Sequence, residues 1–386
     1  MLTRFGWTAL VTAALSIAVG RIFGLIELYV FGVALVVAVA ISLVWVHLPM
    51  PALRVQRRTS PPQLTAGEAA RTDVMITNDG QRHSPQLSLY EQVGDRGGAT
   101  FQLAALAPGE RVGAAYLLPT AQRGVLRCGP LRGRRTDALG LSARTHTLAG
   151  ASEVLILPQT IHLSTPAVGT AGDLGQYLRA ASMAQSGTEF HSMREYVPGD
   201  DLRRISWKAS ARSTTLMVKE TVNEGLRRFT VLVDLDADQY DPLSFERAVS
   251  AAASLIGAVS SSQLEIRLAA ADADFRGPHS AALAAHWLAT VAPLDEPGEL
   301  SSGSGSTDGL GVTTIITGSA TSPAVGSLRA RRTGDAIVVI TTTEPGTGRM
   351  VIDGTSLSSL QRGWERLLGG ESAQWTGAAQ GARGSG

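Results

Sequence analysis

The sequence predicts a multi-domain protein: an N-terminal transmembrane helical hairpin, a β-sandwich, and an α/β domain with a doubly wound sheet. Three observations support this fold class. Two long apolar stretches begin the chain, short alternating segments between turn residues follow, and β-branched runs alternate with helical segments from residue 226 onward. The chain has 386 residues, which accommodates two or three domains of about 150 residues each.

The charge balance and the cysteine content exclude several classes of protein. The 34 Lys and Arg against 33 Asp and Glu leave a net charge of +1, which argues against a nucleic-acid binder. A single cysteine, Cys128, excludes an intramolecular disulfide framework and any multi-Cys zinc site. The sequence contains no HExxH, Walker A, GxSxG or SxxK motif. We therefore expect a protein that is not an enzyme.

A transmembrane hairpin is expected over residues 1–48, with helices at about 5–20 and 25–46. As a helix, the second stretch spans roughly 33 Å, enough for a bilayer core of about 30 Å. The first spans about 24 Å, and Arg4 and Arg21 at its ends can snorkel to the interface. A cleaved signal peptide is the alternative for the first stretch, but the second apolar stretch that follows at once favours two spans.

The flanking charges predict the orientation of the hairpin. Arg54, Arg57 and Arg58 follow the second stretch, Arg4 precedes the first, and the connection holds Arg21. The positive-inside rule then places both ends, and the bulk of the chain, in the cytoplasm. The expected location is the inner (cytoplasmic) membrane, with a multi-pass topology and the lipid bilayer as a partner.

A β-sandwich is expected over residues 52–165, because short alternating runs lie between turn signals such as Asn78-Asp79-Gly80. The expected strands are 72–77, 86–91, 100–103, 111–118, 124–128 and 153–157. No titratable cluster is visible in these runs, so a binding or spacer module is expected. Residues 166–187, rich in Gly, Ala and Ser, predict a flexible linker.

Residues 188–220 form a segment dense in charge. Pro198 and Gly199 predict a turn, after which Asp200 or Asp201 is suited to cap the first turn of a helix. The candidate residues for binding a partner or another domain are Arg194, Glu195, Tyr196, Pro198, Gly199, Asp200, Asp201, Arg203, Arg204, Trp207, Lys208 and Arg212.

In the helix expected after that turn, Arg204, Lys208 and Arg212 share one face at a spacing of four residues. Such a row of cations can hold carboxylates of a neighbouring domain or an anionic ligand. The alternative is an ordinary solvated helix face.

An α/β domain is expected over residues 226–368, because strands at 229–233, 264–269, 312–317 and 336–341 alternate with helices at 244–260, 280–291 and 357–368. Ligands of such sheets bind at the carboxyl ends of strands, where Asp234, Asp236 and Asp238 lie. Three carboxylates could hold Mg2+ or Ca2+. Residues 298–311 predict a flexible insertion, and 369–386 a disordered tail.

The string from Arg194 to Arg212, R-E-Y-x-P-G-D-D-x-R-R-I-x-W-K-A-x-A-R, resembles the signature of a bacterial family, the domain of unknown function fifty-eight. Residues 123–131 and 136–141 are similar to its "RRG…GPL" and "DPFGL" segments. The resemblance implies a von Willebrand factor A-like C-terminal domain and an association with MoxR-type AAA+ ATPases.

The resemblance also bears on the metal site. The metal-ion-dependent adhesion site of such domains begins D-x-S-x-S. Asp234 matches its first position, whereas Asp236 and Asp238 replace the serines, and residues 315–319 supply no later acidic ligand. We therefore expect a degenerate site without a metal cofactor, with Mg2+ or Ca2+ as the alternative.

Together these features predict a membrane-anchored cytoplasmic scaffold or adaptor. The resemblance suggests that its partner is a MoxR-type AAA+ ATPase acting in client assembly or maturation; other membrane or envelope proteins are further candidates. Two alternatives remain open. One is a metal-assisted hydrolase that uses the three aspartates, and the other is a cell-envelope structural protein outside the membrane.

Overall fold

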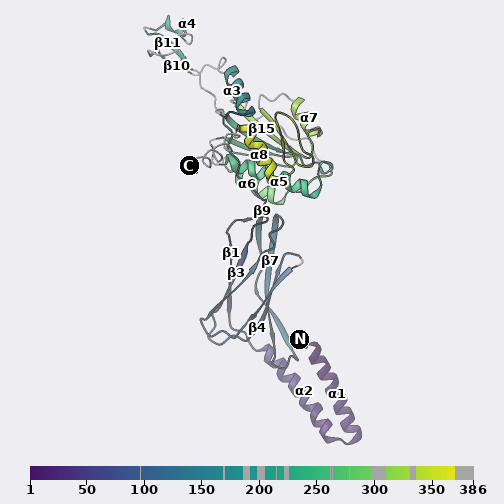
Figure 1. Ribbon diagram of the computed structural model, residues 1–386. Coiled ribbons are helices and arrows are strands. Elements are labelled where there is room, and N and C mark those ends of the chain that lie inside the picture. The colour runs from purple at the N-terminus through teal and green to yellow at the C-terminus, as the bar shows by residue number, and fades with distance from the viewer. Residues whose placement is uncertain are drawn as a thin grey trace, which may run out of the picture. The chain divides into compact units, whose positions relative to one another are not determined.

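The chain forms two compact units, Met1–Leu157 and Pro158–Gly386, in a computed structural model (Figure 1). The structure describes residues 1–95, 97–167, 170–185, 192–197, 205–213, 215–220, 226–260, 262, 264–277, 279–296, 310–330 and 336–369. The first unit includes both the apolar helices and the strands that follow them. The boundaries expected from the sequence at residues 48 and 165 therefore do not separate these units.

Two apolar helices begin the chain, as expected: α1 (Arg4–Phe23) and α2 (Ile26–His47). Thr3 caps α1 by accepting a hydrogen bond from the amide of Gly6, and Gly24 (φ 67°) makes the turn between the helices. Both helices are long and apolar enough to cross a membrane.

Small residues let the two helices pack closely. A Cβ added at Gly32 would lie 2.6 Å from Ile17 Cγ1 and 2.8 Å from the carbonyl oxygen of Ala13. A Cβ at Gly20 would lie 2.6 Å from the amide nitrogen of Tyr29. Larger residues at these glycines would force the helices apart.

The strands of the first unit form two sheets. One has the order β1-β3-β6, and the other has the order β2-β9-β7-β4-β5 with β8 paired to β7. The strands are β1 (Leu53–Ser60), β2 (Leu64–Thr65), β3 (Arg71–Asn78), β4 (Leu87–Val93), β5 (Gly97–Leu103), β6 (Arg111–Leu117), β7 (Gly124–Thr136), β8 (Ala143–Ala149) and β9 (Ser152–Leu157).

Both sheets contribute to a shared hydrophobic core. Val74 and Ile76 of β3 pack with Leu89 of β4 and Leu131 of β7. Each of the six runs expected as a strand lies in or overlaps one of these strands. The sequence did not predict β1, β2, β8 or the second half of β7.

The second unit contains a six-stranded sheet with the order β14-β13-β12-β15-β16-β17. Its neighbouring strands are parallel, except that the edge strand β14 is antiparallel to β13. The strands are β12 (Leu226–Val233), β13 (Glu265–Ala269), β14 (Asp274–Arg276), β15 (Leu310–Thr317), β16 (Ala336–Thr341) and β17 (Val351–Asp353).

Helices cover both faces of this sheet. Side chains of α3 (Asp173–Gln185), α5 (Pro242–Val259), α6 (Ser280–Thr290) and α8 (Leu357–Leu368) share one core with alternate residues of β12, such as Phe229 and Val231. Leu232, on the other face, packs near α7 (Pro323–Ala330). The two faces follow from the period of two residues in a strand.

Part of the expected linker is a helix. Residues 173–185 form α3, and Leu174 and Leu178 of this helix are fully buried in the core. Leu163 belongs to the same core, and the indole of Trp364 donates a hydrogen bond to the carbonyl oxygen of Ser164. Residues 158–165 therefore belong to the second unit rather than to the first. The remaining linker positions 168–169 and 186–187, residues 298–309 of the expected insertion and the tail at 370–386 lie outside the described residues. The last two residues of the expected insertion, Leu310 and Gly311, belong to β15 instead.

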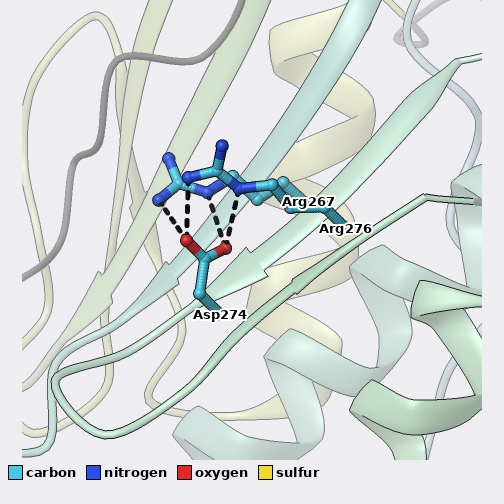
Figure 2. Close-up of polar contacts among 3 residues, drawn as sticks. All are labelled: Arg267, Asp274 and Arg276. Atoms are coloured by element: carbon cyan, nitrogen blue, oxygen red, sulfur yellow. Dashed lines mark hydrogen bonds and ion pairs between the residues drawn. The ribbon is translucent and has the colours of Figure 1, made fainter.

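One aspartate joins β13 and β14 at the edge of the sheet (Figure 2). The Asp274 carboxylate accepts two hydrogen bonds from Arg267, both at 2.9 Å, and two from Arg276, at 3.1 and 2.8 Å. Burial alone would raise the pKa of Asp274, but the hydrogen bonds and charges of the two arginines outweigh it and lower that pKa from 3.8 to about 2.

This cluster predicts a pH dependence of stability. Because the folded pKa of Asp274 is lowered, its stabilisation is fully present above the unfolded pKa of 3.8 and is lost as the pH falls toward 2. We expect the melting temperature of the full detergent-solubilised chain to fall less steeply over this range in Asp274→Asn than in the wild type. Asp173→Asn, which removes the more exposed pair with Arg349, is the matched control. Equal pH profiles for the wild type and Asp274→Asn would contradict this account.

Candidate functional site

The ends of two neighbouring strands meet at Asp234. β12 pairs in parallel with β15, and Val233 lies opposite Ile316. The amide of Asp234, directly after β12, donates a hydrogen bond of 2.9 Å to the carbonyl oxygen of Ile316. In this sheet β13 lies on one side of β12 and β15 lies on the other, so the strand order reverses direction at β12. Open α/β sheets bind ligands at the carboxyl ends of the strands at such a reversal.

The carboxylate of Asp234 is buried, with 4% of the residue exposed. One of its oxygens accepts hydrogen bonds from the hydroxyls of Thr317 and Ser322, each at 2.8 Å. The other oxygen accepts a bond of 3.2 Å from the amide of Asp236. Three neutral donors therefore satisfy a buried carboxylate that would otherwise need a cation.

The loop after β12 lies directly on the strand ends. A Cβ at Gly318 would overlap the carbonyl oxygen of Gln239, which also accepts a hydrogen bond of 2.8 Å from Thr343. The hydroxyl of Tyr240 donates to the carbonyl oxygens of Asp234 and Ile316. Burial, together with the nearby Asp234 and Asp236, raises the pKa of Tyr240, so this phenol stays protonated. The chain itself thus fills the space at the strand ends.

The three aspartates do not form a metal-ligand set. Asp236 caps a short 3-10 turn, because its side chain accepts from the amide of Asp238 at 3.1 Å and from Gln239 at 3.3 Å. The side chain of Asp238 is exposed. Within the described residues, no group of three or more His, Cys, Asp or Glu side chains is placed to hold a metal ion. The three aspartates at this strand end are therefore not placed together as ligands of Mg2+ or Ca2+.

The charged segment contains a small two-stranded sheet. β10 (Ser192–Glu195) pairs antiparallel with β11 (Met217–Glu220), so that Arg194 lies opposite Val218. The amide of Tyr196 donates to the carbonyl oxygen of Leu216 at 2.8 Å. The other expected residues in this stretch, Pro198, Gly199, Asp200, Asp201, Arg203 and Arg204, lie outside the described residues.

A short helix, α4 (Trp207–Ser210), is held against β11. The amide of Ser206 donates to the carbonyl oxygen of Met217, and the amide of Met217 donates to the hydroxyl of Ser210, both at 2.8 Å. Within the described residues this helix is much shorter than the one expected from Asp200 to Arg212. Arg212 lies beyond its end, so Lys208 and Arg212 do not form a row on one helix.

Four candidate residues among those described are exposed: Glu195, Trp207, Lys208 and Arg212. Trp207 has 69% of its surface exposed, although a tryptophan is usually among the more buried residues. Two cations therefore lie close in sequence to a large exposed aromatic side chain. This combination is suited to protein recognition rather than to chemistry.

The sequence did not reveal a buried polar cluster in the first unit. The Arg57 guanidinium donates to the carboxylate of Glu91 at 2.5 Å, and Glu91 is fully buried. Burial and the charge of Glu91 raise the pKa values of Tyr116 and Cys128. The thiol of Cys128 is thus a protonated, buried group rather than a reactive one. Because Arg57 and Glu91 lie on different sheets, no local pattern could have predicted the pair.

Comparison with known proteins identifies one family. Residues 192–275 match the family model "Protein of unknown function DUF58". This range contains most of the charged segment, the strand end at Asp234 and Asp274. No curated protein matches the chain.

Several solved structures are similar to parts of the chain. The CARDB domain of a Pyrococcus furiosus protein, in complex with di-metal ions, is 15% identical, covers 28% of this chain and 94% of that chain, and has a TM-score of 0.21. The Pseudomonas fluorescens alkylpurine DNA glycosylase AlkC is 10% identical over 34% of this chain and 39% of that chain, with a TM-score of 0.20. Beta-glucosidase 3B from Thermotoga neapolitana is 15% identical over 27% and 17%, with a TM-score of 0.16. Likenesses this small do not establish a shared fold or function.

The saturated carboxylate of Asp234 leads to a prediction about stability and metals. Asp234→Ala leaves two buried hydroxyls without an acceptor, and should lower the free energy of unfolding by about 2–4 kcal/mol. Asp234→Asn keeps one acceptor oxygen and should lose less. Millimolar Mg2+ or Ca2+ should not raise the melting temperature of the full chain relative to EDTA. A metal-dependent rise that disappears in Asp234→Asn would instead reveal a working metal site.

Proposed function

We propose that the protein, whose residues 192–275 match a family model of unknown function, is a membrane-anchored scaffold or adaptor that recruits a partner protein. The resemblance of its signature segment to MoxR-associated proteins suggests that this partner is a MoxR-type AAA+ ATPase. In this proposal the protein helps the ATPase to assemble or mature a client.

The arrangement of the strands supports a finer description of the fold. In this proposal the two sheets of the first unit, which share a hydrophobic core, form a β-sandwich. In the second unit, strands counted in chain order from β12 follow the doubly wound order 3-2-1-4-5-6. This order agrees with the von Willebrand factor A-like fold implied by the family resemblance.

The observation that carries the proposal is the exposure of Trp207 in the segment that matches the family. Tryptophan and arginine are enriched among the residues that dominate binding energy at interfaces. Lys208 and Arg212 add positive charge, which complements an acidic partner surface and speeds the encounter. These residues therefore form the proposed docking surface for the ATPase.

The two apolar helices support the proposed anchor. Their length and composition suit a bilayer, and the arginines that flank them favour a cytoplasmic location of both units. The hydrolase alternative receives less support, because the carboxylate of Asp234 is satisfied by hydroxyls and the strand ends are covered by the loop that follows β12.

Substitution of Trp207 tests this proposal. The detergent-solubilised full chain should co-purify with a MoxR-type ATPase in its nucleotide-bound state, and Trp207→Ala should weaken the binding by about tenfold or more, as expected for a binding hot spot. Leu243→Ala is the matched control, because Leu243 is a similarly exposed apolar residue of the second unit, at 72%, and lies outside the docking surface. The proposal fails if the wild type binds no such ATPase, or if both variants bind as well as the wild type.

A further inference from the structure

The helical hairpin is bonded to the turn between β7 and β8. The amino terminus donates a hydrogen bond of 2.9 Å to the carbonyl oxygen of Ala143. The amide of Thr3 donates one of 3.0 Å to the carbonyl oxygen of Leu141. From α2, the hydroxyl of Ser42 lies 2.5 Å from the hydroxyl of Ser142. These bonds hold the end of the β7–β8 hairpin beside the end of α2.

A buried arginine lies at this junction. Arg135 of β7 is 5% exposed, its guanidinium lies 5.3 Å from the centre of the Trp45 ring, and its Nη1 donates to the carbonyl oxygen of Leu48 at 3.1 Å. Its Nε is buried and has no hydrogen-bond partner among the residues that the structure describes. Burial of a cation without a counter-ion is unfavourable, so an anion at this place would stabilise it.

Three more basic groups surround Arg135. Arg144 lies directly opposite it on β8, and His146 lies opposite Gly133, so the three side chains share one face of the hairpin. Burial and the charges of Arg144, Arg135 and His47 lower the pKa of His146. His47 lies in the chain between Trp45 and Leu48, the two residues that the Arg135 guanidinium contacts. No ion pair among the described residues involves Arg135 or Arg144.

We propose that this junction cluster, formed by His47, Arg135, Arg144 and His146, binds the phosphate of an anionic phospholipid headgroup. The inference rests on the proposed membrane anchor. The cluster lies where α2 ends, and the last turns of that helix carry exposed apolar side chains such as Ile41 and Val44, which the acyl chains would cover. Trp45 is an aromatic residue of the type that settles at headgroup level. Like charges directly opposite each other on two strands are unfavourable unless an anion lies between them.

Lipid selectivity of the full chain tests the proposal. The chain is reconstituted in phosphatidylcholine nanodiscs that contain a small share of spin-labelled phosphatidylglycerol, and separately of spin-labelled phosphatidylcholine. The motionally restricted fraction of each label is compared. We expect phosphatidylglycerol to be preferred by about fivefold or more, the effect of one basic residue near the membrane surface.

Matched variants identify the binding groups. Arg144 is exposed, so Arg144→Gln should leave the fold intact. The double variant Arg144→Gln with His146→Gln should bind phosphatidylglycerol and phosphatidylcholine almost equally. Arg134→Gln removes a cation from the opposite face of β7 and should keep the preference. The proposal is overturned if the wild type shows no preference, or if Arg134→Gln reduces it as much as Arg144→Gln does. It is also overturned if an acidic peptide, but not the lipid, binds the cluster. Failure of the membrane anchor is distinct, because the chain would then not be recovered in the nanodiscs at all.

Discussion

The hydrogen bonds that Thr317 and Ser322 donate to the buried carboxylate of Asp234 are the interaction on which the second unit depends. They join the end of β12 to the end of β15 and to the residue before α7. Hydroxyls satisfy the carboxylate, and the loop that carries Gln239 lies against the end of β15 at Gly318. A sheet closed in this way is a stable platform, and the residues suited to recognition lie elsewhere, on the segment that carries Trp207.

The first unit is constrained from both ends. Glycines allow α1 and α2 to pack closely, and hydrogen bonds from Thr3 and Ser42 join these helices to the β7–β8 hairpin. The helices and strands of this unit are therefore one structural element rather than an anchor followed by a separate domain. Arg135 is buried at the junction, and among the described residues its Nε has no hydrogen-bond partner, which accords with the proposal that the bilayer supplies a negative charge there.

Local patterns in the sequence predicted many of the helices and strands, because the spacing of apolar residues along the chain reflects the period of each element. Apolar runs predicted the two helices, alternation predicted six strands, and the position of Asp234 at a strand end was correct. The patterns failed where the structure depends on contacts between residues far apart in the sequence. The partners of Asp234 lie 83 and 88 residues further along the chain, and α3 has the composition of a linker but is buried through Leu174 and Leu178.

We propose that the segment containing Trp207 recruits an AAA+ ATPase at the cytoplasmic face of a membrane. Cross-linking mass spectrometry of the wild-type protein in native membranes tests it most directly, because it identifies the partner and the side of the membrane together. The account predicts cross-links from Lys208 to a MoxR-type ATPase. Cross-links from this segment only to proteins outside the membrane, with none to an ATPase, would contradict it.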